Sequence, residues 1–208
     1  MQQAVVSSTY AGQIAHYAIL SGASEVITEV NDNYCRQTFR TRCQILGPNG
    51  IETLTIPVVK PSEKTKVKDI VIDGTQWQTQ HIRAIETAYN SSPFLEYYLD
   101  DLMPFYTKAY KWLYDFNTEL EDKVCTLIGI SFNRCVTGSY LSYPDNTDFR
   151  QMVEKKSVMP KNFTPEPYYQ VFKEKFGFVK NLSIMDLLLN MGPESILILK
   201  KSLPLQVV

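Results

Sequence analysis

The sequence predicts an α/β fold, and three observations support this prediction. Two short apolar runs flank a helix-like segment within the first thirty residues, Asn49-Gly50 lies between two apolar and β-branched runs, and the second half repeats apolar residues at helical spacing. We therefore expect an N-terminal βαβ unit, a mixed sheet with a parallel core plus an antiparallel hairpin, and helices packed on that sheet. The C-terminal half is expected to be helical.

The chain of 208 residues is long enough to bury a sizeable core, and we expect one domain over 1–208. Its sheet-forming part is expected at 1–73 and its mainly helical part at 74–208. With 44% hydrophobic and 21% charged residues, the composition excludes global disorder. The 21 basic residues nearly cancel the 22 acidic ones, whereas a nucleic-acid binder would usually show a basic excess. We expect no nucleic-acid partner, and any anion site must be local.

The first three elements form the predicted βαβ unit. An apolar run at 4–6 indicates a buried strand, and Ser8 or Thr9 could cap a helix over about 12–20. A second strand follows at 25–30. Strand, helix and strand within so short a stretch predict parallel pairing and a right-handed crossover. The carboxyl ends of both strands are then the expected place for a ligand.

The next segments complete the sheet. Runs at 42–46 and 52–59 flank Gly47-Pro48-Asn49-Gly50 and predict an antiparallel hairpin. The polar connection at 58–68 holds four lysines and is interpreted as a solvated loop or, alternatively, as a flap over an anionic ligand. A further short strand is expected at 67–73.

The remainder is expected to be mainly helical. Trp77, His81, Ile85 and Ala88 lie on one face of a helix that would run from Gly74 to about Tyr89. Helices are also expected at 92–101, at 104–117, from a Thr118-x-x-Glu121 capping box to about Gly129, at 168–176 and at 183–190. An edge strand is expected at 136–143 and a long loop at 144–167, while 196–201 fits a helix or a strand equally well.

The stretch from Asn31 to Ile45 concentrates groups that suit an anion, because it holds Arg36, Arg40 and Arg42. As a strand it would place all three on one side, and as a helix it would make Arg36 and Arg40 neighbours. Guanidinium groups offer forked donors for phosphate or carboxylate. The candidate substrate-binding residues are Tyr10, Tyr34, Arg36, Gln37, Arg40, Arg42 and Trp77. The candidate general bases are His81 and Asp32, although His81 on that face is more typical of a packed core or interface histidine.

Other features narrow the function classes. The N-terminus lacks the basic start and long apolar run of a secretory signal, and no stretch approaches a membrane span, so we expect a cytoplasmic protein. The four cysteines are scattered without a CxxC pair, which favours buried thiols over a disulfide or metal site. With two histidines in the chain we expect no metal site, and no particular cofactor is indicated.

Three segments together resemble the WbqC-like family. They are N-Y-C-R-Q-T-F-R-T-R-C-Q-I-L-G-P-N-G with T-I-P-V, W-x-x-x-H-I-R-A-I-x-x-A-Y-x-x-S-P-F-L-E-Y-Y, and N-L-S-I-M-D-L-L-L-N-M-G-P-E. The resemblance covers the chain from about Val5 to Glu194. Members take their name from gene clusters for O-antigen and other surface polysaccharides, so the resemblance implies a role in making or modifying an activated sugar. The resemblance does not identify a catalytic residue in this chain.

A second resemblance is narrower. In other members of that family the segment matching Thr9 to Tyr17 is similar to the first turn of HIGH-type nucleotidyltransferases, where imidazoles after a strand hold a triphosphate. This chain has only His16 there. Such a relative would transfer a nucleotidyl group, and the missing second histidine argues against it. His16 is also typical of a packed or surface histidine.

Three hypotheses follow. The first is a transferase of surface-polysaccharide biosynthesis that binds a small phosphate-bearing substrate, such as a nucleotide sugar, through the arginines. The second is a non-catalytic binding or scaffold module of a biosynthetic complex, which the absence of a nucleophile–base pair or glycine-rich phosphate loop favours. In the third the arginines are structural and pair with Glu25, Glu29, Asp32 or Asp69.

Overall fold

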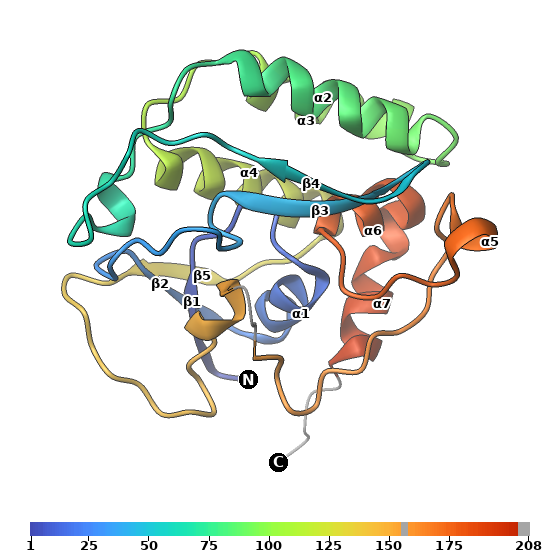
Figure 1. The fold of residues 1–208 in the computed structure, drawn as a ribbon. Coiled ribbons are helices and arrows are strands. Elements are labelled where there is room, and N and C mark those ends of the chain that lie inside the picture. Colours follow the sequence, from blue (N-terminus) through green and yellow to red (C-terminus); the bar gives the residue numbers. More distant parts are fainter. Residues whose placement is uncertain (155–157, 204–208) are drawn as a thin grey trace.

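The computed structural model describes residues 1–154 and 158–203, and its N-terminal strands form a parallel sheet (Figure 1). Strands β1 (Gln3–Ser7), β2 (Glu25–Glu29) and β5 (Asn133–Val136) pair in the order β1-β2-β5, and α1 (Ile14–Gly22) connects the first two. The predicted βαβ unit is therefore confirmed. The outer edge of β1 is covered by a later segment, since the Val5 amide donates to the Thr147 carbonyl at 2.8 Å.

The predicted hairpin is also present. Strands β3 (Arg42–Gly47) and β4 (Gly50–Thr55) pair antiparallel from Arg42 opposite Thr55 to Gly47 opposite Gly50. Gly50 has a φ of 112°, which the turn requires and a side chain would strain. The two strands form a sheet of their own beside the parallel one, so the mixed α/β architecture is confirmed with its two kinds of pairing in separate sheets.

Helices surround both sheets (Figure 1). Helix α2 packs on β3, while α1 contacts both α6 and α7. The face of α2 that was predicted to be buried is buried, with Trp77, His81, Ile85 and Ala88 turned inward. The helices are α2 (Gln76–Tyr89), α3 (Leu95–Leu102), α4 (Leu113–Ile128), α5 (Lys173–Phe176), α6 (Ile184–Met191) and α7 (Ser195–Ser202), with 3-10 turns η1 (Val67–Asp69), η2 (Met103–Tyr106), η3 (Arg150–Val153) and η4 (Gly192–Glu194).

The predictions for three elements before residue 130 need correction. The strand at 67–73 is η1 followed by isolated bridges, because Val71 and Ile72 each pair once, with Trp112 and Val58. In place of the predicted helices at 104–117 and 118–129, the chain forms η2, an irregular stretch and then the single helix α4. Glu121 lies in its interior and pairs with His16 and Arg134 instead of capping a helix start.

Three further expectations need correction. The edge strand lies at β5 rather than 136–143, because Thr137 bonds the Glu29 carboxylate and ends the pairing with β2. The helix at 168–176 is shortened to α5, since the side chains of Tyr168 and Gln170 turn to Asp186. All four cysteines are free thiols as expected, but Cys35 and Cys135 are exposed rather than buried. The ambiguous segment 196–201 is helical.

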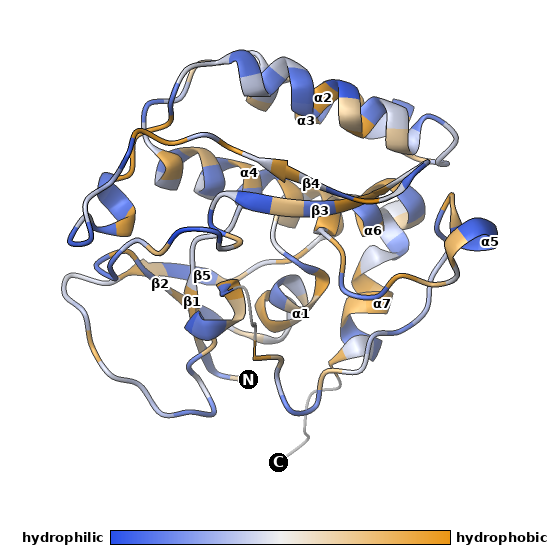
Figure 2. Cartoon of the chain, in the orientation of Figure 1, coloured by the Kyte–Doolittle hydropathy of each residue, from blue (hydrophilic) through white to orange (hydrophobic). Residues whose placement is uncertain are grey.

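One cluster of buried apolar side chains joins the two halves of the chain, running from Ala4 through Ile45 and Phe116 to Leu199. Figure 2 shows apolar residues in the strands and helices of both halves. A shared core of this kind supports the proposal of a single domain over 1–208. Among helices built from described residues, none is both long and apolar enough to cross a bilayer.

A buried carboxylate anchors α6 in this core. Asp186 is 1% exposed and accepts hydrogen bonds from the Tyr89 hydroxyl at 2.8 Å and the Tyr168 hydroxyl at 2.6 Å. Gln170 Nε2 donates to it at 2.9 Å. Burial raises the pKa of Asp186, and these three donors partly oppose the shift. Ser183 caps the start of α6, because its Oγ accepts a hydrogen bond from the Met185 amide.

Replacing Asp186 with alanine is expected to lower the free energy of unfolding by about 2–4 kcal/mol, because three buried donors lose their acceptor. Urea denaturation monitored by circular dichroism measures this loss. The matched control is Asp100→Ala, which removes an exposed aspartate from α3 and should change the stability by less than about 0.5 kcal/mol. Equal losses in the two variants would contradict the assignment.

Candidate functional site

A pocket lies at the open end of the hairpin. Because Arg42 and Thr55 are cross-strand partners, the segment that leads into β3 and the segment that leaves β4 lie side by side. We call 34–41 the incoming segment and 56–61 the outgoing segment. Together with both strand ends they enclose an open pocket of about 430 Å³. Its lining residues are Tyr34, Arg36, Gln37, Thr41, Arg42, Thr55, Ile56, Pro57, Val58, Lys60 and Pro61.

Backbone hydrogen bonds hold both walls in place. In the incoming segment the Tyr34 amide donates to the Thr65 carbonyl at 2.8 Å, and the Phe39 amide donates to the Val153 carbonyl at 2.8 Å. In the outgoing segment, Val59 donates to Val71 at 2.9 Å and the Pro57 carbonyl accepts from Asp73 at 2.9 Å. The pocket is therefore largely formed before any ligand arrives, which lowers the entropic cost of binding.

The charged side chains among the described lining residues of the pocket are all positive. Arg36 and Lys60 are exposed and Arg42 is partly buried, and all three line it. Of the lining residues within the described ranges, none is acidic, and these three cations form no ion pair with any described carboxylate. The buried Nε of Arg42 has no hydrogen-bond partner among described residues. A cationic pocket with unused guanidinium donors suits phosphate or carboxylate.

The rim of the pocket stores backbone strain at Gln37, whose φ is 61°. A residue with a side chain rarely occupies the left-handed region, and it persists there only when the surrounding structure holds it. Here Thr38 Oγ1 bonds the Cys35 carbonyl and the Thr41 amide bonds the Thr38 carbonyl. Such outliers gather at ligand sites, which agrees with the placement of Gln37 on the lining.

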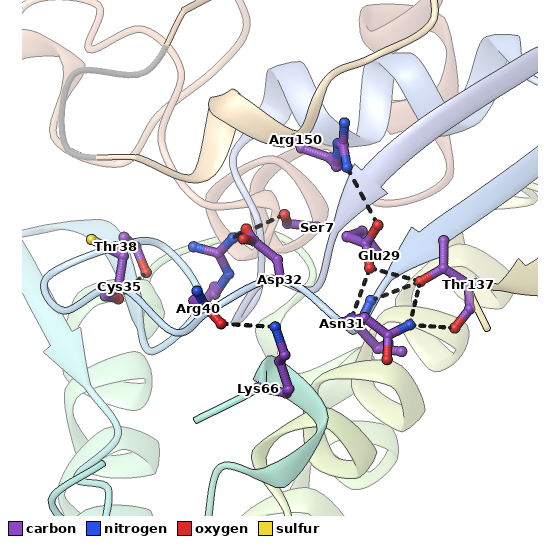
Figure 3. A network of polar contacts seen from close by, with 12 residues as sticks. Ser7, Glu29, Asn31, Asp32, Cys35, Thr38, Arg40, Lys66, Thr137 and Arg150 are labelled. Carbon is purple, nitrogen blue, oxygen red and sulfur yellow. Dashed lines mark hydrogen bonds and ion pairs between the residues drawn. The ribbon is translucent and has the colours of Figure 1, made fainter. Parts of the chain in front are cut away.

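The third arginine of the cluster points elsewhere (Figure 3). Arg40 is 3% exposed, and its Nη2 donates to Asp32 Oδ2 at 2.8 Å and to Ser7 Oγ at 3.2 Å. The Arg40 carbonyl accepts from Asn117 Nδ2 at 2.9 Å. Burial lowers the pKa of Arg40, and Asp32 opposes that shift. Arg40 and Asp32 therefore form a structural pair at the carboxyl end of β1, outside the pocket.

A second network fills the carboxyl end of β2. Glu29 is fully buried and accepts from the Asn31 amide at 2.7 Å, from Thr137 Oγ1 at 2.7 Å and from Arg150 Nη1 at 3.3 Å (Figure 3). Arg150 also bonds Asp148 at 2.6 Å. The sheet rim expected to receive a ligand is thus occupied by the protein's own ion pairs. The incoming segment lines the pocket with Tyr34, Arg36 and Gln37 and reaches the rim only at Arg40, which bonds Ser7 at the end of β1.

Three other candidate residues form a buried aromatic cluster. The Tyr10 hydroxyl bonds His81 Nδ1 at 2.9 Å and the Tyr106 hydroxyl at 3.2 Å, while the Trp77 ring lies 5.1 Å from that of His81. Burial lowers the pKa of His81 to about 4, and a hydrogen bond to the Thr55 backbone partly opposes the shift. His81 is 4% exposed and lies behind the pocket wall, since Thr55 lines the pocket and His81 does not.

The start of α1 offers nothing to a triphosphate. His16 is 3% exposed, and its Nε2 lies 2.7 Å from Glu121, which also pairs with Arg134 at 2.7 Å. The first helical amides are satisfied as well, because Ile14 donates to the Leu182 carbonyl and Ala15 donates to Asn181 Oδ1. The features that would support a nucleotidyltransferase relative are therefore engaged inside the protein.

The structure divides the nine candidate residues into three groups. Tyr34, Arg36, Gln37 and Arg42 come together in the pocket, Asp32 and Arg40 pair with each other, and Tyr10, Trp77 and His81 share the aromatic cluster. Sequence reasoning did not select Lys60, Thr41, Thr55 or Pro57, which also line the pocket. A signal for Lys60 existed in the lysine-rich connection at 58–68. The predicted hairpin, followed beyond both strand ends, would have placed that connection beside the arginines.

Asp32→Ala is expected to lower the free energy of unfolding by about 3–5 kcal/mol, because it leaves the buried Arg40 guanidinium without its carboxylate. Arg36→Ala should change the same quantity by less than about 0.5 kcal/mol, since Arg36 is exposed. Urea denaturation of both variants makes the comparison. A stable Asp32→Ala variant would show that this pair does not hold the incoming segment.

The pH dependence of the free energy of unfolding is expected to reflect the protonation of His81. The unfolded histidine takes up a proton near pH 6.5, whereas folded His81 takes one up only near pH 4. Stability therefore falls as the pH drops through that window, by roughly 3 kcal/mol in all, and His81 adds no pH dependence above it. Urea denaturation at several pH values, compared with His81→Gln, isolates the effect, because other groups titrate in both proteins. Parallel stability curves would refute it.

Comparison with known proteins identifies a family whose matched region contains the pocket. The model of the WbqC-like protein family matches residues 8–155, a range that includes both pocket segments and the hairpin. The chain is also 26% identical to the uncharacterized protein Rv1507c of Mycobacterium tuberculosis over 218 aligned positions, covering 92% of this chain and 94% of that protein. No solved structure matches. On the strength of the family match, the chain belongs to the WbqC-like protein family.

Proposed function

We propose that this protein binds a phosphate-bearing activated sugar, or a related small anion, in the pocket at the open end of the hairpin. It would act in surface-polysaccharide biosynthesis as a transferase-like protein. The single observation that carries the proposal is the convergence of Arg36, Arg42 and Lys60 on one preformed hollow with no acidic side chain among its described lining residues. A nucleotide sugar is the substrate class that this charge fits best.

The lining supports two kinds of contact with such a ligand. On the polar side, two guanidinium groups and an ammonium can meet phosphate oxygens, while Thr41 and Thr55 offer hydroxyls. On the apolar side, the Tyr34 ring and Pro57 offer flat surfaces to a sugar or a base. Family membership adds an association with surface polysaccharides through the gene clusters for which the family is named.

Catalysis in this proposal depends on positioning more than on a base. His81 and Asp32 do not line the pocket, so a base role for either requires the wall at Thr55 or the Arg40 pair to open. Holding two reactants in register can by itself lower a barrier by about 7–11 kcal/mol. His81 and Asp32 stay candidate catalytic residues on this condition.

The kinds of side chain that line the pocket favour a second candidate function. A pocket whose described lining holds neither carboxylate nor imidazole nor thiol fits a non-catalytic module that binds the activated sugar for a partner enzyme. The two functions share the ligand and differ in turnover. The cytoplasmic location and the absence of a nucleic-acid partner remain predictions under both.

Isothermal titration with inorganic phosphate, glucose 1-phosphate and UDP-glucose tests the proposal. The wild-type protein is expected to bind the phosphorylated sugars, and the Arg36→Ala/Arg42→Ala double variant is expected to bind them at least about tenfold more weakly, because each lost charge-assisted hydrogen bond costs roughly 1.5–3 kcal/mol. Arg83→Ala is the matched control, since it removes an exposed arginine of α2 that does not line the pocket.

Unchanged affinity in the double variant, or no binding of any of these compounds to the wild-type protein, would refute the proposal. Transfer of the bound sugar by the purified protein to an added acceptor would identify a transferase. Binding without turnover, together with a stable partner recovered at fixed stoichiometry, would identify the module.

A further inference from the structure

The cationic side chains reach the pocket from both of its walls. Arg36 belongs to the incoming segment, Arg42 begins β3, and Lys60 belongs to the outgoing segment. A ligand between the two segments therefore meets positive charge on two sides. A diphosphate spreads its negative charge over two linked groups, so it can contact both walls at once, whereas a single phosphate group is more compact. The arrangement suits the longer anion.

Proteins commonly hold diphosphates through Mg²⁺, which is itself bound by one or two carboxylates and by the phosphate oxygens. The described lining of this pocket supplies no carboxylate for that purpose. Asp32, which lies close to Arg36 in sequence, is bonded to Arg40 at 2.8 Å and does not line the pocket. Across residues 1–154 and 158–203, no three His, Cys, Asp or Glu side chains are grouped as metal ligands.

Charge repulsion also disfavours a Mg²⁺ ion in this pocket. A Mg²⁺ ion that entered with the diphosphate would lie among three positive side chains, in a hollow whose described lining offers it no opposite charge. The free diphosphate, in contrast, would find guanidinium forks and an ammonium in place of the metal.

We propose that the pocket binds the diphosphate group of an activated sugar as the metal-free anion, with Arg36, Arg42 and Lys60 in the place that Mg²⁺ takes in other diphosphate sites. The proposal rests on the proposed function, because it concerns the same pocket. It adds the number of phosphate groups, the role of Lys60 and the independence from a divalent cation. No bond is made or broken in this binding step.

Titration of the full chain with UDP and with inorganic pyrophosphate tests the proposal, once in EDTA and once in excess Mg²⁺ at matched ionic strength. Binding in EDTA is expected to be at least as tight as in Mg²⁺, because the metal competes with the protein for the same oxygens. Glucose 1-phosphate, with one phosphate group, is expected to bind about tenfold more weakly than UDP-glucose in EDTA.

Lys60→Ala is expected to weaken pyrophosphate binding about tenfold in EDTA, without recovery when Mg²⁺ is added. Its matched control is Lys64→Ala, which removes an exposed lysine from the same connection outside the pocket lining and should bind as the wild type does. Circular dichroism of both variants verifies that they are folded.

The failures of the two proposals are distinguishable. Binding of UDP only in Mg²⁺, or recovery of Lys60→Ala by Mg²⁺, would overturn the metal-free proposal and leave the proposed function standing. Equal affinity for glucose 1-phosphate and UDP-glucose would overturn the assignment of a diphosphate. Absence of binding by every phosphate compound, with and without Mg²⁺, would overturn both proposals.

Discussion

The ion pair between Arg40 and Asp32 is the constraint on which the candidate site depends. A guanidinium that is 3% exposed needs a charged partner, and Asp32 meets it at 2.8 Å across eight positions of the chain. This closure folds the residues between them into turns rather than a strand or helix. Arg36 and Gln37 are therefore left at the outer side of the loop, where the hairpin places Arg42. A structural pair thus positions Arg36, a cation that forms no ion pair in the described part of the chain, beside Arg42.

The proposed binding groups and the candidate general bases lie apart in this molecule. The pocket holds cations, hydroxyls and apolar surface, while the neutral His81 lies behind its wall with a pKa of about 4. The carboxyl ends of β1 and β2, where α/β folds commonly bind ligands, are filled by internal ion pairs around Glu29 and Arg40. The pocket lies instead at the open end of the second sheet. This separation explains why the geometry supports ligand binding more directly than a particular reaction.

Local sequence patterns correctly predicted the elements that are set by apolar spacing and turn residues. The βαβ unit, the Asn49-Gly50 hairpin and the buried face of α2 were all predictable, because apolar spacing and turn chemistry are local properties. The patterns failed where a side chain had a distant partner. Glu121 has the spacing of a capping residue but bonds His16 inside α4, and Tyr168 turns to Asp186 instead of continuing a helix. Such partners lie far away in sequence, so no window of neighbouring residues reveals them.

The sequence by itself determined the fold class, the family and the stretch in which cationic residues gather. It could not determine which of the arginines line the pocket, because Arg36, Arg40 and Arg42 are chemically alike and differ only in what surrounds them. Tertiary structure buried Arg40 against Asp32 and Ser7, left Arg36 exposed, and added Lys60 from beyond the second strand of the hairpin. The physical reason is that burial and opposite charge depend on residues brought together by folding, whereas composition and spacing are properties of the chain alone.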